Sequence, residues 1–168
     1  MRDARPEDAS GVADVHIRTW QEAYQHVFPA EGLAGLDEGR LQRERFWLDA
    51  IEAAVPRRHI LVVETPDGAV GFASVGATRD DDTLGELYAI YVLSEHWGRG
   101  VGAALMREAL ERLRRDDFDE AVLWVLADNP RARAFYERWA WFADGVARGG
   151  VHLETPTHEV RYRIALRT

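Results

Sequence analysis

Three glycines that alternate with other residues offer the clearest chemistry in this chain. Gly98, Gly100 and Gly102 follow an apolar run and open a stretch with helical spacing. A glycine has no Cβ, so its backbone adopts positive φ and approaches a ligand closely. The first amides of a helix have no partner within it, and they lie at the positive end of its dipole. The spacing therefore predicts a turn that holds a phosphate or diphosphate; the alternative is a tight connection in which the glycines serve only sterics.

The same spacing excludes two common phosphate-binding loops. A dinucleotide fingerprint needs G-x-G-x-x-G, and a P-loop needs G-x-x-x-x-G-K-[ST]. Here Gly102 is followed by two alanines, and the chain contains no lysine. A dinucleotide-binding enzyme therefore fails on motif spacing, and so does a P-loop.

Two elements must position the glycines. Residues 87–92 form an apolar, β-branched and aromatic run, which is typical of a strand. A helix begins at Val101, with one apolar face and charged side chains on the other. Residues 121–126 form a second apolar run, as a strand buried on both faces does.

The remaining elements complete an α/β sandwich with a mixed, largely antiparallel sheet flanked by helices. We expect an edge strand at 2–5, helices at 6–25, 37–54 and 129–138, strands at 60–64 and 70–78, an acidic turn at 79–82, a turn at Gly149–Gly150, and a hairpin of strands at 151–154 and 159–166. The length and the lack of a linker predict a single domain over residues 1–168.

Composition limits the partners. The formal net charge of −8 argues against nucleic-acid binding and favours a cationic small substrate, although solubility alone explains it too. No stretch is long enough for a membrane span. The absence of cysteine excludes disulfides and thiol catalysis, and His152 and His158 lack carboxylate support for a metal. We expect a cytoplasmic protein that binds no nucleic acid, membrane or metal.

The run WGRGVG at residues 97–102 resembles R/Q-x-x-G-x-G/A, the acyl-CoA loop of the GNAT superfamily of N-acetyltransferases. It departs from that pattern at the first position, where Trp97 replaces Arg or Gln. A second GNAT motif, N-x-x-A-x-x-F-Y, is matched by Asn129, Ala132, Phe135 and Tyr136. The order of elements is similar to the GNAT fold along nearly the whole chain.

The resemblance implies acetyl-CoA as the cosubstrate. Its diphosphate would bind the loop amides, and its pantetheine arm would pair with the strand backbone as an added strand does. The amide of Val92 would polarise the thioester carbonyl, and Asn129 would contact the arm from the opposite side. The implied coenzyme-binding residues are Ile90, Tyr91, Val92, Trp97, Gly98, Arg99, Gly100, Val101, Gly102, Ala103, Asn129 and Tyr136.

Two residues are candidates for proton transfer. The resemblance implies that Tyr136 protonates or hydrogen-bonds the departing thiolate; the alternative is an aromatic side chain that only covers the sheet. Glu86 lies 14 residues before Gly100, the separation of the catalytic glutamate in histone-acetylating members. It shares strand parity with Tyr88, Ile90 and Val92, and so faces the same cleft unless a bulge intervenes. It would deprotonate an amine of pKa about 10; the alternatives are a water relay and a solvated strand-end glutamate.

The acceptor is the least readable part of the sequence. Trp20, Tyr24 and Phe28 lie where the resemblance places the acceptor pocket, and they fit core packing equally well. No residue is suited to act as a covalent nucleophile. The predicted function is therefore direct transfer of acetyl from acetyl-CoA to a small-molecule or peptide primary amine in a ternary complex. A non-catalytic acyl-CoA-binding or regulatory domain is the alternative, and a homodimer stays open.

Overall fold

The computed structural model describes residues 1–79 and 81–167. Asp80, within the predicted turn at 79–82, and Thr168 lie outside the described residues. The elements follow one another as β1 (Arg2–Asp3), η1 (Pro6–Asp8), α1 (Ala9–Ala23), α2 (Ala30–Ala34), η2 (Gly35–Asp37), α3 (Arg40–Glu52), β2 (His59–Thr65), β3 (Gly68–Ala77), β4 (Gly85–Val92), η3 (Ser94–His96), α4 (Val101–Arg115), β5 (Glu120–Leu126), α5 (Pro130–Glu137), β6 (Phe142–His152) and β7 (Thr155–Ala165).

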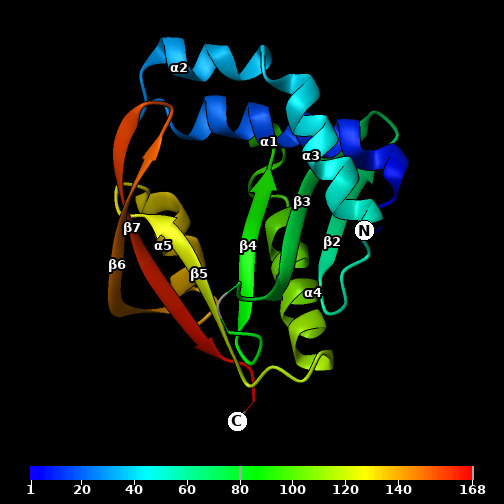
Figure 1. The fold of residues 1–168 in the computed structure, drawn as a ribbon, viewed down its shortest axis with the longest axis vertical. Helices are drawn as coiled ribbons and strands as arrows, with labels where there is room; N and C mark the ends of the chain where they lie inside the picture. The colour runs from blue at the N-terminus through cyan, green and yellow to red at the C-terminus, as the bar shows by residue number, and fades with distance from the viewer. Residues whose placement is uncertain (80, 168) are drawn as a thin grey trace.

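The strands of the described chain form one seven-stranded sheet in the order β1-β2-β3-β4-β5-β7-β6 (Figure 1). Neighbouring strands run antiparallel except β4 and β5, which are parallel. The parallel pair follows from the connection, because α4 carries the chain from the end of β4 back to the start of β5. The predicted mixed, largely antiparallel sheet flanked by helices is confirmed.

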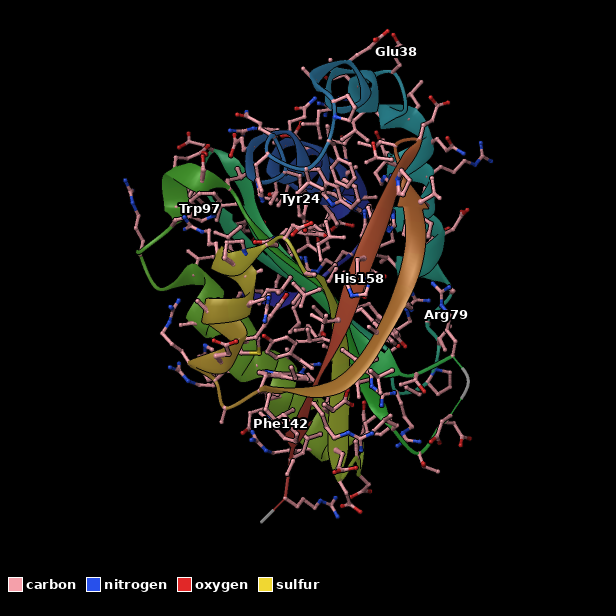
Figure 2. The ribbon with its side chains drawn as sticks, turned by 90° about the vertical axis from the view of Figure 1, so that its left-hand side faces the viewer. Tyr24, Glu38, Arg79, Trp97, Phe142 and His158 are labelled. Carbon is pink, nitrogen blue, oxygen red and sulfur yellow. The ribbon has the colours of Figure 1, made fainter. Side chains whose placement is uncertain are left out.

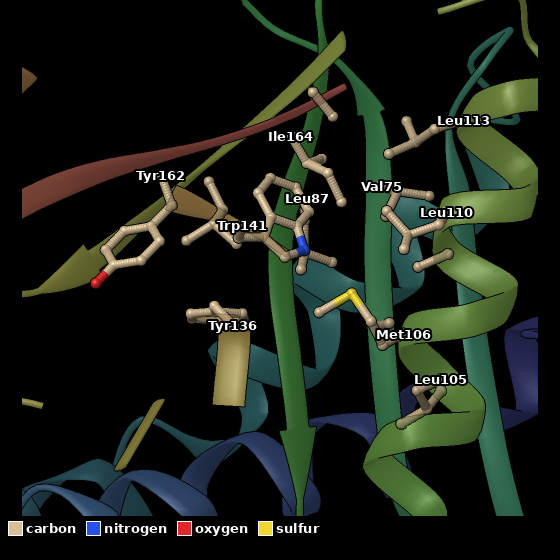
Figure 3. Close-up of a cluster of buried hydrophobic side chains, with 14 of the residues drawn as sticks. Val75, Leu87, Leu105, Met106, Leu110, Leu113, Tyr136, Trp141, Tyr162 and Ile164 are labelled. Carbon is tan, nitrogen blue, oxygen red and sulfur yellow. The ribbon is translucent and has the colours of Figure 1, made fainter. Parts of the chain in front are cut away.

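Helices cover the two faces of the sheet. On one face α4 buries Leu105 and Leu113 in a cluster that includes side chains of β3, β4 and β5 (Figure 3). On the other face, Val12 of α1 and Trp47 of α3 pack with Phe72 of β3. A β4 side chain therefore belongs to one of two layers, and its layer tells which way it points.

The glycine turn and the apolar spacing together explain α4. Gly100 is its N-cap, with a φ of 85°. The buried positions recur on one face at Leu105, Met106, Ala109, Leu110 and Leu113. Three arginines occupy the last turn, where the negative end of the helix dipole favours cations. The predicted helix that begins at Val101 is confirmed.

Two predictions about the secondary structure are wrong. Gly149–Gly150 is not a turn but part of β6, and the hairpin turns at Leu153–Glu154. Both turn residues have positive φ, 47° and 59°, as two-residue hairpin turns require. Such turns usually contain Asn or Gly, so Leu-Glu gave no signal, and both strands are longer than predicted. The helix predicted at 37–54 begins later, at Arg40, because α2 and η2 precede it.

Candidate active site

The central opening lies between β4 and β5. The two strands pair only at Gly85 with Ala121 and at Glu86 with Val122. Beyond these pairs the strands diverge (Figure 1). The rest of β4, residues 87–92, pairs with β3 alone. This part of the sheet therefore presents a strand edge in the middle of the molecule rather than at its rim.

The backbone of β4 alternates between β3 and the opening. Leu93 donates its N–H to Val70 of β3 at 3.0 Å, so Tyr91, two residues earlier, also pairs toward β3. The N–H and C=O groups of Ile90 and Val92 consequently point into the opening. The indole Nε1–H of Trp97 donates to the Val92 carbonyl at 2.7 Å, which agrees with this direction. An extended ligand chain in the opening would meet these groups as a neighbouring strand does.

The glycine turn follows β4 and η3, beyond the end of β4 that does not pair with β5. Gly98 and Gly100 have φ of 72° and 85°, and a Cβ at either would have open space around it. Their conformation, not crowding, is what requires glycine. Ala104 is the first residue of α4 whose N–H bonds within the helix, to Gly100 at 2.9 Å. The amides of residues 101–103 therefore remain at the exposed end of the helix, as an anion cradle needs.

Tyr136 of α5 packs beside this opening (Figure 3). Its ring centroid lies 5.7 Å from that of Phe135, 6.4 Å from Trp141 and 6.3 Å from Tyr162. Burial raises the pKa of the phenol, and the nearby Tyr91 phenol raises it further. A phenol of raised pKa stays protonated at neutral pH, so it can donate a hydrogen bond or a proton.

Three phenols from different parts of the chain come together here: Tyr24 at the C-cap of α1, Tyr91 of β4 and Tyr136 of α5. Burial raises the pKa of Tyr24 well above its usual value, and the Tyr91 and Tyr136 phenols add to that shift. The Asn129 side chain acts in the opposite direction on Tyr24. Asn129 is buried and caps α5, where its Oδ1 accepts the Ala132 N–H at 3.0 Å. Tyr24, predicted to contact the acceptor, therefore lies near Asn129 and Tyr136, predicted to contact the coenzyme.

A β-bulge changes the orientation expected for Glu86. Opposite β3, Ser74 pairs with Ala89 while Val75 pairs with Leu87, so Tyr88 is an extra residue in β4. Alternation is interrupted at such a residue. The bulge that the prediction allowed for is therefore present, and Glu86 does not share the orientation of Ile90 and Val92.

The two layers of the core show where Glu86 points instead. Leu87, Ile90 and Val92 lie in the α4 layer, whereas Ala89 and Tyr91 lie in the layer of α1 and α3. Glu86 precedes Leu87 and so faces the α1 side, at the narrow base of the opening. After burial, the Glu86 carboxylate is the largest cause that raises the pKa of Tyr88. Glu86 and Tyr88 thus lie close together on this face.

The predicted acceptor residues form an aromatic wall on the same α1 side. Trp20 donates its Nε1–H to the Tyr91 hydroxyl at 3.1 Å and stacks on Phe28 with centroids 5.7 Å apart. Tyr24 meets Trp20 edge-on at 5.1 Å. Phe28 is only 3% exposed and packs with Leu126 of β5, so it supports the wall from behind.

Sequence reasoning missed the Tyr91 side chain in this wall and the contact between Trp124 and Arg148. The sequence predicts only a backbone role for Tyr91, yet its ring stacks on that of His16 with centroids 5.0 Å apart. His16 accepts the Trp47 Nε1–H at 3.3 Å, and burial lowers its pKa to about 3. The imidazole is therefore neutral and part of the packing. The guanidinium carbon of Arg148, in β6, lies 4.0 Å from the centroid of the Trp124 ring of β5. A contact between β5 and β6 leaves no local sequence pattern, so no signal pointed to it.

Comparisons with known proteins give sequence relatives for this fold. Residues 17–141 match the Acetyltransferase (GNAT) family. The uncharacterized N-acetyltransferase YuaI of Bacillus subtilis is 31% identical over 143 residues, which cover 83% of this chain and 78% of that protein. The mycothiol acetyltransferase of Beutenbergia cavernae is 36% identical over 109 residues, 65% of this chain but only 34% of that longer protein. None of the helices in the described chain is long and apolar enough to cross a membrane.

Solved structures agree on the fold. The PaiA N-acetyltransferase of Thermoplasma acidophilum, crystallised in complex with coenzyme A, superposes with a TM-score of 0.74 at 18% identity, covering 94% of this chain and 95% of that chain. The ribosomal-protein-S18-alanine N-acetyltransferase of Escherichia coli gives 0.65 at 16% identity, covering 99% and 93%. With the β4–β5 opening, the glycine turn and the capped α5 in one site, and with the family matched over 125 consecutive residues from 17 to 141, the chain belongs to the GNAT family of acetyltransferases.

Proposed function

We propose that this protein transfers an acetyl group from acetyl-CoA to a primary amine by direct attack in a ternary complex. The observation that carries the proposal is the strand edge at Ile90 and Val92, which the glycine turn closes at one end and Tyr136 borders. A long, thin ligand with a diphosphate at one end and amide groups along its arm fits such an edge. Coenzyme A has that form.

The proposed reaction assigns one task to each group. The amine nitrogen attacks the thioester carbonyl carbon, a C–N bond forms and the C–S bond breaks. The N–H of Ile90 or Val92 stabilises the carbonyl oxygen as it becomes negative, and one such donor contributes about 3 kcal/mol. Tyr136 gives its proton to the departing thiolate. The proton lost by the amine goes to Glu86, directly or through water.

The acceptor enters, in this proposal, from the α1 side, where Glu86 and the Tyr91 ring point. Trp20 and Tyr24 border that side, and aromatic faces attract cations such as a protonated amine. The net charge of −8 also draws cationic molecules toward the protein. A primary amine that arrives protonated is therefore the substrate class that best matches this face.

The direct test uses the wild-type protein. We expect acetyl-CoA to raise its melting temperature, and we expect at least one amine among spermidine, an aminoglycoside, amino acids and a peptide with a free N-terminus to release thiol from acetyl-CoA. Binding at a hundred times the dissociation constant adds about 2.7 kcal/mol to the free energy of unfolding. Stabilisation without thiol release from any amine supports a non-catalytic acyl-CoA-binding domain instead, and no stabilisation contradicts both functions.

A Glu86→Gln variant tests the proposed base. We expect kcat/KM for the amine to fall by about 10² or more near pH 7, with a loss that shrinks as the pH approaches the amine pKa of about 10. The reason is that free amine in solution needs no base. The measurement is kcat/KM from pH 6 to 10. Glu120→Gln, which removes an exposed carboxylate paired with Arg163 at 2.6 Å, is the matched control. A Glu86→Gln profile parallel to that control removes Glu86 from the mechanism.

A further inference from the structure

A cation is held on an aromatic ring at the edge of the glycine turn. The Arg131 guanidinium carbon lies 3.4 Å from the centroid of the Trp97 ring. The Trp97 ring is itself fixed by its Nε1–H bond to the Val92 carbonyl, 2.7 Å long. Arg131 is the second residue of α5, and it is exposed. Figure 2 shows Trp97 in the segment that leads into α4, on the same side of the molecule as α5.

Trp97 occupies the position at which the GNAT loop pattern has Arg or Gln. The chain thus lacks the polar side chain of that pattern at the start of its own loop. Arg131 brings a guanidinium to the same place from another helix. A guanidinium stacked on an indole keeps its N–H groups free at the rim, so the stack orients the cation without using its hydrogen-bond donors.

The surroundings of Arg131 favour an anion. Helices α4 and α5 pack against each other, since a Cβ at Gly102, in the first turn of α4, would be 3.6 Å from the Phe135 ring of α5. Arg131 lies in the first turn of α5, where the helix dipole contributes positive potential. Within residues 1–79 and 81–167, no ion pair is recorded for Arg131. This guanidinium lies in the first turn of α5, is stacked on Trp97 just before the glycine turn, and has no carboxylate partner in the described chain. Such a group suits a phosphate, which accepts two parallel N–H bonds from it.

We propose that Arg131, oriented by Trp97, binds a phosphate group of the coenzyme. The inference rests on the proposed function, because the same turn holds the coenzyme in both. It goes beyond the proposed function because it assigns a phosphate contact to a side chain of α5, in place of the Arg or Gln that the loop lacks. Arg131 could bind either the diphosphate or the 3′-phosphate of coenzyme A, because both are phosphate groups. Ligands that lack one or both of these groups distinguish the two possibilities.

The test compares Arg131→Gln with Arg138→Gln. Arg138 is exposed on the same helix, at its C-cap, and serves as the matched control. Dissociation constants are measured for acetyl-CoA, its 3′-dephospho form and acetyl-pantetheine. We expect Arg131→Gln to weaken acetyl-CoA binding at least tenfold, to flatten its salt dependence, and to leave acetyl-pantetheine unchanged. An equal loss with the 3′-dephospho ligand assigns Arg131 to the diphosphate, and no loss with it assigns Arg131 to the 3′-phosphate.

A rescue experiment separates recognition of phosphate from general damage. Trp97→Arg in the Arg131→Gln background returns a guanidinium to the loop, as in the GNAT pattern, and we expect it to recover most of the lost affinity. Circular dichroism and melting temperature check that each variant is folded. Wild-type affinity in Arg131→Gln overturns the inference and leaves the proposed function intact. Failure of the wild-type protein to bind acetyl-CoA overturns both.

Discussion

Tyr136→Phe is expected to lower kcat by about 10² or more while the dissociation constant of acetyl-CoA changes little. The phenol lies beside the opening, and burial and the neighbouring Tyr91 phenol both raise its pKa, so it remains protonated throughout the neutral range. General acids contribute about 10²–10⁴ to enzymatic rates. The measurements are kcat with the best amine and acetyl-CoA affinity by titration.

The pH dependence has a definite sign. Because the folded pKa of Tyr136 is raised, the wild-type protein keeps its acid form as the pH rises through 9, and kcat shows no alkaline loss attributable to this group there. Tyr162→Phe is the matched control, since it removes the hydroxyl of a buried tyrosine whose ring lies 6.3 Å from that of Tyr136. That hydroxyl bonds Arg133 at 3.0 Å and Glu137 at 2.7 Å, so its loss affects stability rather than rate. Equal rate losses in the two variants contradict the acid role of Tyr136.

Gly100→Ala is expected to weaken acetyl-CoA binding at least tenfold. A φ of 85° costs an alanine about 1–2 kcal/mol, so the turn shifts toward negative φ and the amides that follow change direction. The anion cradle is then lost although no side chain of the protein is in the way, because a Cβ at Gly100 meets open space. Affinity is measured by titration and folding by melting temperature.

Gly145→Ala provides a control with the same backbone strain. Gly145 also has a φ of 85° and open space around a Cβ, but it lies in β6, outside the predicted site. The two variants should lose similar free energy of unfolding, and only Gly100→Ala should lose coenzyme affinity. If both variants bind acetyl-CoA as the wild-type protein does, the amides at the Gly100 turn do not hold the diphosphate.

The sequence predicted the parts of the fold that depend on local spacing. The glycine turn and α4 follow from positive φ at Gly98 and Gly100 and from an apolar face that repeats with the helix period. The strand at 121–126 follows from an uninterrupted apolar run. In these segments the residue types and the tertiary packing require the same structure.

Features that depend on distant contacts were not predictable. The bulge at Tyr88 is set by the pairing of β3 with β4, and the segment GELYAIYV has no internal glycine or proline to mark it. The side of the sheet that Glu86 faces depends on this bulge, so it was not predictable either. The stack of Arg131 on Trp97 joins residues from two separate segments, and neither residue carries a signal for the other.

In the proposed function, the two-residue junction between β4 and β5 would make the stability of the fold depend on the coenzyme. Within residues 1–79 and 81–167, β4 pairs with β5 only at Gly85 and Glu86. In the proposed function, the pantetheine arm of bound acetyl-CoA pairs with β4 where no strand of the protein does. Binding of the coenzyme then adds to the free energy of unfolding. Without acetyl-CoA, side-chain packing would supply most of the contact between the two halves of the sheet, so the free energy of unfolding would rise with the coenzyme concentration.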